Sequence, residues 1–225
     1  MPVNIASTID HTLLKPEAQP EQISQLCREA AMYQFASVCV PPSYVAQAVR
    51  ELRGTGVPVC TVVGFPLGYQ TTETKLAEAR QLLLQGAKEL DMVLNIGDLL
   101  ARRTAQVEDE VTQLADLCHS NDALLKVIIE TALLTECAII AACQLCATAG
   151  VDFVKTSTGF ASRGASVADV ELMRRSLPPH IRIKAAGGIR TREAALALLA
   201  AGAARIGSSN SLVLLQDNAH ETAAS

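Results

Sequence analysis

Residues 124–130, Leu-Leu-Lys-Val-Ile-Ile-Glu, form a short apolar run, and a second run, Phe153–Thr156, follows it after the helix-like stretch Thr135–Thr148. Both runs are nearly continuous in apolar and β-branched residues, which is typical of strands buried on both faces. Two such strands joined by a helix form a βαβ unit, and βαβ units build parallel sheets. The stretch 124–156 therefore predicts an α/β fold with a parallel sheet.

The same alternation of apolar runs and amphipathic patterns extends along the chain in both directions. The predicted strands are Ile9–Leu13, Ser37–Val40, Val59–Val63, Leu90–Asn95, Leu124–Glu130, Phe153–Thr156, Ile181–Ala185 and Arg205–Ser208. The predicted helices between them are Pro20–Gln34, Ser43–Arg53, Glu73–Gln85, Thr104–His119, Thr135–Thr148, Val167–Ser176 and Thr191–Ala200.

The number of strands decides between two architectures. Eight strands in 225 residues predict a (β/α)8 TIM barrel, whose usual length is about 250 residues. The count depends on the first strand, because Ile9–Leu13 also fits a helical turn, and seven strands would suit an open doubly wound sheet. We expect one barrel domain over residues 1–216 and a flexible C-terminal tail over residues 217–225.

Composition and missing motifs narrow the class of protein further. The chain is 49% hydrophobic and carries a net charge of −4 without any run of basic residues, which argues against a nucleic-acid partner. It has no apolar segment long enough to span a membrane and no secretory signal, so we expect a cytoplasmic protein. No glycine-rich nucleotide-binding motif follows any strand, which argues against a dinucleotide or P-loop site.

The cysteines and histidines give little support to a metal or redox site. Seven cysteines, an odd number, form no disulfide framework. Cys143 and Cys146 make a Cys-x-x-Cys pair inside an apolar helical stretch, where cysteine usually acts as a small apolar residue. The four histidines show no metal-ligand spacing. We therefore expect no metal and no cofactor.

Charged residues lie inside several of the predicted strands. Any one of them alone fits a structural ion pair, but Asp91, Lys155 and Lys184 together favour catalysis, since active-site residues of this fold come from the ends of the strands. Lysines on consecutive strands would lower each other's pKa and leave one amine neutral and nucleophilic, while Asp91 relays protons. These residues alone do not decide which lysine is the nucleophile. Lys126 with Glu130 is predicted to be a supporting pair, and Asp10 fits either role.

Two glycine turns predict an anion site. Gly187-Gly188 follows the seventh strand and Gly207-Ser208-Ser209 follows the eighth, the two loops that often bind phosphate in this fold. Backbone N–H groups and serine hydroxyls of such turns can donate to phosphate oxygens, although ordinary tight turns would look the same. Cys39 is predicted to face the barrel mouth as a small filler, because no cationic partner lies near it in sequence.

Six segments, in order between Ile9 and Leu212, resemble motifs of the deoxyribose-phosphate aldolases. They are Ile9-Asp-His-Thr-Leu-Leu-Lys15, Val62-Val-Gly-Phe-Pro-Leu-Gly68, Leu90-Asp-Met-Val-Leu-Asn-Ile-Gly97, Leu125-Lys-Val-Ile-Ile-Glu-Thr131, Val154-Lys-Thr-Ser-Thr-Gly-Phe160 and Ile183-Lys-Ala-Ala-Gly-Gly-Ile-Arg190.

The resemblance implies a class I aldolase on a (β/α)8 barrel that cleaves 2-deoxy-D-ribose 5-phosphate and uses no metal. It assigns the Schiff base to Lys155, the tuning of that amine to Lys184 and proton relay to Asp91. It also implies a phosphate site that includes Gly159, and a homo-oligomer, dimeric or tetrameric. Another lysine aldolase, a metal-free isomerase and an inactive sugar-phosphate-binding barrel are the alternatives.

The chain departs from the pattern of this family at three places. Phe160 stands where some members have a lysine that assists phosphate binding, which places the chain in the branch with shorter sequences. Ala186 replaces a serine that is common in that branch. Gly207-Ser-Ser-Asn210 replaces the more usual Gly-Ala-Ser-Ser, so the serine that contacts phosphate is left undecided.

Overall fold

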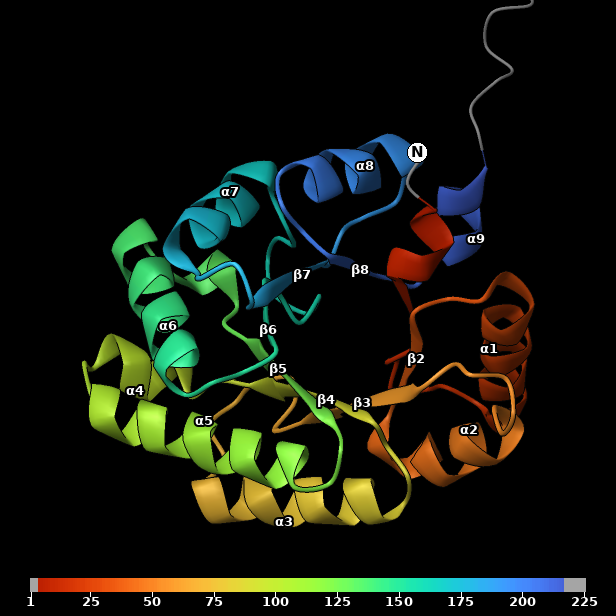
Figure 1. Ribbon diagram of the computed structural model, residues 1–225, viewed down its shortest axis with the longest axis horizontal. Helices are drawn as coiled ribbons and strands as arrows, with labels where there is room; N and C mark the ends of the chain where they lie inside the picture. The colour runs from red at the N-terminus through yellow and green to blue at the C-terminus, as the bar shows by residue number, and fades with distance from the viewer. Residues whose placement is uncertain (1–3, 217–225) are drawn as a thin grey trace, which may run out of the picture.

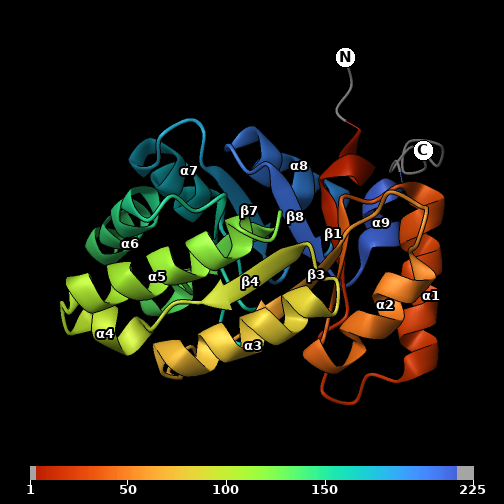
Figure 2. The ribbon, with the colours of Figure 1, turned by 60° about the horizontal axis from the view of Figure 1, so that its bottom comes forward.

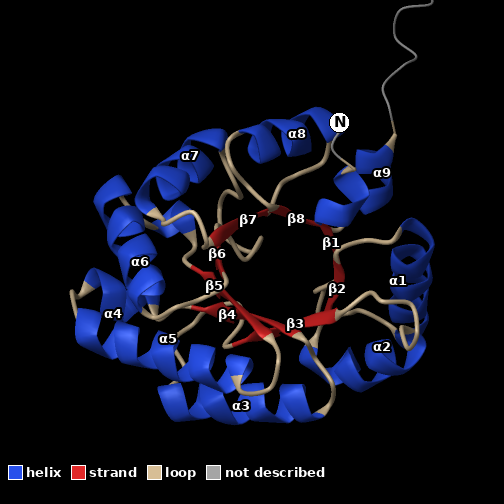
Figure 3. Ribbon diagram, in the orientation of Figure 1, coloured by secondary structure: helices blue, strands red, loops and turns tan. Residues whose placement is uncertain are grey.

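The barrel is closed and contains eight parallel strands in chain order (Figures 1 and 3). The structure is a computed structural model that describes residues 4–216, so the predicted tail, residues 217–225, lies outside the described residues. The strands are β1 (Ile9–Thr12), β2 (Ser37–Val40), β3 (Val59–Val63), β4 (Glu89–Val93), β5 (Leu124–Ile128), β6 (Phe153–Lys155), β7 (Arg182–Ala186) and β8 (Arg205–Ser208).

The first strand closes the barrel. Asp10 of β1 lies opposite Ser37 of β2 on one side and opposite Gly207 of β8 on the other. The segment is therefore a strand and not the helical turn that its sequence also fits, and the predicted (β/α)8 fold is confirmed. An open doubly wound sheet would have two edge strands, whereas here each strand pairs with a neighbour on both sides.

The helices form a ring outside the strands, as Figure 2 shows for α3 and α5 along one flank and for α1 and α2 along another. Within the described residues they are α1 (Pro20–Tyr33), α2 (Val45–Glu51), α3 (Thr72–Leu84), α4 (Ile96–Leu100), α5 (Thr104–His119), α6 (Glu136–Thr148), α7 (Val167–Ser176), α8 (Arg192–Ala200) and α9 (Ser211–Leu215). Short 3-10 turns precede β1, α2 and α6: η1 (Ile5–Thr8), η2 (Pro42–Tyr44) and η3 (Thr131–Leu133).

Local capping sets where two of the predicted helices begin. The side-chain oxygens of Ser166 and Thr191 accept hydrogen bonds from the backbone N–H groups of Asp169 and Ala194, so α7 and α8 start directly after them. The helices α4 and α9 add to the predicted elements, because five residues each are too few to show an amphipathic period. None of the helices within residues 4–216 is both long and apolar enough to cross a membrane.

The Cys-x-x-Cys pair lies on α6, in the apolar layer between the helices and the barrel. Cys143 and Cys146 are fully buried, and neither takes part in a disulfide. Burial raises the pKa of the Cys143 thiol to about 12. Both residues therefore pack as small apolar side chains, as predicted.

Candidate active site

The barrel interior holds a cluster of buried charges contributed by strands that are far apart in sequence. Side chains alternate along a strand, so Asp10 of β1, Asp91 of β4, Lys126 of β5, Lys155 of β6 and Lys184 of β7 all point inward. Asp91 lies in register with Lys126, and Lys155 lies in register with Lys184. The structure thus brings together the three residues that the sequence analysis favours for catalysis.

Asp91 is the central acceptor of this cluster. Its Oδ2 accepts from the Nζ atoms of Lys155 and Lys184, each at 2.7 Å, and its Oδ1 accepts from Lys126 Nζ at 2.9 Å. Burial alone would raise the pKa of Asp91, but the three lysines hold it well below the ordinary value. Asp91 is therefore an ionised carboxylate that neutralises and connects the amines.

Lys184 differs from its predicted electrostatic behaviour. Its Nζ lies 2.7 Å from Asp91 Oδ2 and 2.5 Å from Asp10 Oδ2. Burial alone would lower the pKa of Lys184, but these two carboxylates raise it above its ordinary value. The expectation that the paired lysines lower each other's pKa is therefore wrong for Lys184, because a nearby carboxylate outweighs a nearby ammonium. Lys184 is a cation that can donate a proton.

The predicted supporting pair of Lys126 and Glu130 is wrong. Lys126 Nζ contacts Glu89 Oε2 at 2.6 Å as well as Asp91. Glu130 lies beyond the end of β5, where its positive φ of 53° turns the chain away. Its carboxylate accepts instead from the backbone N–H of Thr158, at 3.1 Å, and from the Thr158 hydroxyl. Glu130 therefore fixes the loop after β6.

Asp10 supports the cluster from the opposite side to Asp91. Besides Lys184, its carboxylate contacts Arg205 Nε at 3.1 Å. Burial opposes ionisation, but Lys184, Lys126 and Arg205 lower the pKa of Asp10 from 3.8 to about 2. This pairing orients Lys184, so of the two roles that the sequence left open for Asp10, the structure favours the supporting one.

We expect Asp10 to make the stability of the protein sensitive to acid. Its folded pKa of about 2 lies below the ordinary value of 3.8, so the stabilisation is present above about pH 4 and is lost as the pH falls toward 2. The full contribution is about 2 kcal/mol. Urea unfolding should show that the stability difference between wild type and Asp10→Asn shrinks by about 1 kcal/mol from pH 6 to pH 3. A constant difference over this range would contradict the assignment.

A cavity of about 790 Å³ opens at the carboxyl ends of β1, β6, β7 and β8. Lys155 lines it, whereas Lys126 and Lys184 are fully buried beneath. A substrate in this cavity therefore meets the amine of Lys155. All of the predicted phosphate-binding residues also line the cavity: Gly159, Gly187, Gly188, Gly207, Ser208 and Ser209.

The glycines at two of these turns are required by the local geometry. Gly187 has a φ of +85°, and a Cβ there would lie 3.0 Å from Gly164 Cα, so a side chain would be both strained and crowded. A Cβ at Gly207 would lie 3.2 Å from Lys184 Cε. Glycine at position 207 therefore leaves room for the buried lysine as well as for close approach of a ligand.

The two serines of the β8 turn have different surroundings. The Ser208 hydroxyl donates to the Ile189 carbonyl at 3.3 Å and accepts from the Asn210 N–H at 3.0 Å. Ser209 is exposed and lines the cavity. Ser208 therefore links the β7 and β8 turns to each other, and Ser209 is the serine whose hydroxyl is better placed to meet a ligand.

Several cavity residues are not predicted from the sequence. Lys15 and Arg190 are exposed cations at the rim, and His11 and Glu29 line the side that faces α1. Phe160 also lines the cavity and packs edge-to-face on Phe65, with ring centroids 5.3 Å apart. Phe160 and Phe65 thus form an apolar wall at this side of the cavity. Exposed cations and a helix residue such as Glu29 carry no distinctive sequence signal.

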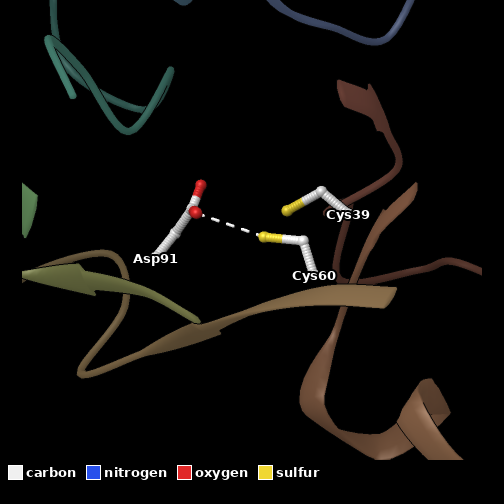
Figure 4. Close-up of side chains that lie close together, drawn as sticks. All are labelled: Cys39, Cys60 and Asp91. Carbon is white, nitrogen blue, oxygen red and sulfur yellow. Dashed lines mark hydrogen bonds between the residues drawn. The ribbon is translucent and has the colours of Figure 1, made fainter. Parts of the chain in front are cut away.

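Cys39, Cys60 and Asp91 form a group that could in principle hold a metal ion (Figure 4). Cys60 Sγ donates to Asp91 Oδ1 at 3.1 Å, and Lys126 Nζ lies 3.3 Å from the same sulfur. Burial, Cys39 and Asp91 raise the pKa of Cys60 well above its ordinary value. A cation would have to displace buried ammonium groups and ionise a reluctant thiol, so these residues fit a metal poorly.

Cys39 is buried in the barrel, as a filler would be, but it does have cationic neighbours. The hydrogen bond with Cys60 and the charges of Lys184 and Lys155 lower the pKa of its thiol despite burial. These lysines come from β6 and β7, far from Cys39 in sequence, so the residues that flank Cys39 in the sequence do not reveal them.

The barrel, the cavity at the carboxyl ends of its strands and the amine within it are the arrangement of a TIM-barrel enzyme, since active sites of this fold lie at that face. A family model described as "DeoC/LacD family aldolase" matches residues 5–216, and the chain belongs to this family.

Individual relatives are similar over nearly their whole length. A deoxyribose-phosphate aldolase of Clostridium novyi is 48% identical over 221 residues, which cover 98% of this chain and 99% of the relative. One of Streptococcus equi subsp. zooepidemicus is 51% identical over 214 residues, covering 95% and 96%. A deoxyribose-phosphate aldolase structure from Aeropyrum pernix, described as tetrameric, is 36% identical with a TM-score of 0.88, covering 94% of this chain and 89% of that one.

Proposed function

We propose that this protein catalyses the reversible aldol cleavage of 2-deoxy-D-ribose 5-phosphate to glyceraldehyde 3-phosphate and acetaldehyde through a Schiff base on Lys155. The observation that carries this proposal is the position of Lys155, which lines the cavity while its Nζ lies 2.7 Å from Asp91 Oδ2. The names of the relatives support the choice of substrate.

In the cleavage direction the neutral Lys155 amine attacks the C1 aldehyde, and loss of water gives an iminium ion. The C3 hydroxyl then loses its proton as the C2–C3 bond breaks, and the bonding electrons move toward the iminium nitrogen. Glyceraldehyde 3-phosphate leaves, and the enamine that remains is protonated at C2. Hydrolysis of the resulting iminium releases acetaldehyde and restores the amine.

The charge balance of the cluster supports this use of Lys155. The ion pairs join three carboxylates (Asp10, Glu89 and Asp91) to four cations (Lys126, Lys155, Lys184 and Arg205). When Lys155 attacks as a free amine, three cations face three carboxylates. Asp91 Oδ2 touches both Lys155 and Lys184, so protons can pass between the two amines through one oxygen.

The phosphate group fits the glycine turns after β7 and β8. Backbone N–H groups near Gly188 and the Ser209 hydroxyl would donate to it, and Lys15 and Arg190 at the rim would add positive charge. Holding the phosphate places C1 of the sugar near Lys155, which is how binding energy assists the chemical step. We further propose a cytoplasmic homo-oligomer that needs no metal or cofactor, with the barrel of residues 1–216 as its catalytic domain.

Trapping of the Schiff base tests this proposal. Incubation with 2-deoxyribose 5-phosphate followed by borohydride should add the mass of a reduced adduct, and peptide mapping should place it on Lys155. Fructose 1,6-bisphosphate under the same conditions should give no adduct, and an adduct with that sugar alone would indicate a different aldolase. Failure to label Lys155 with the deoxy sugar would overturn the mechanism.

A further inference from the structure

His11 is a buried histidine that has no part in the proposed aldol reaction. It follows Asp10 on β1, so its side chain points out of the barrel, toward α1 and α9. Its Nε2 lies 2.8 Å from Glu29 Oε2 of α1, and its Nδ1 lies 2.8 Å from Ser211 Oγ of α9. The residue is 4% exposed and still lines one side of the cavity.

The hydrogen bonds of His11 continue into the turn after β8. Ser211 Oγ also lies 3.1 Å from the Ser208 carbonyl oxygen, so its hydroxyl can donate either to that oxygen or to His11. The Ser208 hydroxyl in turn donates to the Ile189 carbonyl in the turn after β7. One chain of contacts therefore joins helix α1 to both of the turns that face the cavity from β7 and β8.

Hydrogen bonds also fix the α1 end of this series of contacts. Glu29 Oε1 accepts from Gln25 Nε2 at 2.7 Å, which leaves Oε2 directed at His11. Because a carboxylate can only accept, the hydrogen on Nε2 of His11 must point to Glu29, and Nδ1 is then directed at Ser211. The ring of His11 also lies 5.0 Å from that of Phe35. Its position is thus set by α1 and by the loop before β2.

We propose that His11 is a positioning residue that holds the turn of residues 207–210 in the geometry that accepts a phosphate, and so sets the preference for phosphorylated over unphosphorylated sugar. Glu29 and Ser211 are its two supports. The inference rests on the proposed function for its substrate but concerns a different part of the site, because the contacts of His11 lead away from Lys155 and Asp91. The helix that follows the turn, α9, is only five residues long, so contacts with neighbouring elements hold the turn in place.

Kinetics with two sugars test the assignment. The kcat and KM of wild type, His11→Leu and Ser211→Ala would be measured with 2-deoxyribose 5-phosphate and with 2-deoxyribose. For both variants we expect KM for the phosphorylated sugar to rise by about tenfold or more, the loss that one or two hydrogen bonds can cause. We expect kcat for that sugar, and kcat/KM for 2-deoxyribose, to change by less than about threefold.

His119→Leu is the matched control, because His119 also pairs with a carboxylate, Asp152, at 3.0 Å, but lies at the exposed end of α5. It should leave the ratio of the two kcat/KM values unchanged. Equal losses on both sugars in Ser211→Ala, which changes only one atom, would show that His11 has a merely structural role, and an unchanged KM would also overturn the proposal. If wild type cleaved neither sugar, the proposed function would fail instead, and weaker binding of inorganic phosphate by Ser211→Ala, measured by calorimetry, would still decide the role of His11.

Discussion

The variant Lys155→Met should lose at least about a thousandfold in kcat and still fold. Methionine is apolar and nearly as long as lysine, so it fills the space but offers no amine for a Schiff base. A thousandfold loss corresponds to about 4 kcal/mol of transition-state stabilisation, a modest share of what covalent catalysis by an enzyme supplies. Asp91 keeps Lys126 and Lys184 as partners in this variant, so no buried charge is left unpaired.

The variant Lys155→Arg separates nucleophilic chemistry from charge. Arginine keeps a positive charge next to Asp91 but stays protonated and cannot form the iminium ion. Both variants should therefore be inactive and should give no adduct after borohydride, while circular dichroism shows a folded barrel. Activity in Lys155→Arg close to that of wild type would show that Lys155 contributes only charge. In that case Lys184 would be the nucleophile to test.

The sequence predicts the fold well because a buried parallel strand shows as an apolar run in the sequence, whichever strands it pairs with. Strands β5 and β6 are mostly apolar, so they are visible as runs even though their neighbours are unknown. Their ends are less visible. Strand β5 stops at Ile128, two residues before its predicted end at Glu130, because Glu130 adopts a left-handed conformation to reach Thr158. That contact lies in the next loop and leaves no mark on the sequence of β5.

The sequence predicts which buried charged residues of the candidate site lie together, but not the direction of their pKa shifts or the residues at the rim of the cavity. Asp91, Lys155 and Lys184 stand out because charges are rare in buried strands. The sign of the pKa shift of Lys184 depends on Asp10, whose distance from Lys184 only the closure of the barrel sets. The contact of His11 with Ser211 spans 200 positions and joins two common residue types, so periodicity and motifs do not reveal it.

The variant Asp91→Asn should damage both activity and stability. An amide cannot neutralise three lysines, so Lys126, Lys155 and Lys184 would face each other with only Asp10 and Glu89 as counter-charges. Removing one partner of a buried ion pair costs about 3–5 kcal/mol, which for a chain of this size lowers Tm by roughly 6–20 °C. Loss of the shared proton acceptor should lower kcat by at least about a hundredfold. Calorimetry and steady-state kinetics would measure the two effects.

Glu110→Gln is the control that separates these two effects. Glu110 of α5 pairs with Lys75 of α3 at 2.7 Å, and both side chains are buried outside the barrel. This change also removes the charge of a buried carboxylate next to a lysine, so it should lower Tm as well. The decrease should be smaller than in Asp91→Asn, because burial raises the pKa of Glu110 whereas three lysines lower that of Asp91. The kcat of Glu110→Gln, measured well below Tm, should stay within about twofold of wild type, because its pair does not touch the cluster around Lys155.

If Glu110→Gln lost activity as severely as Asp91→Asn, the loss in Asp91→Asn would reflect instability rather than proton transfer. If only Asp91→Asn is inactive at a temperature where both variants are folded, the carboxylate that touches Lys155 and Lys184 acts in the reaction itself.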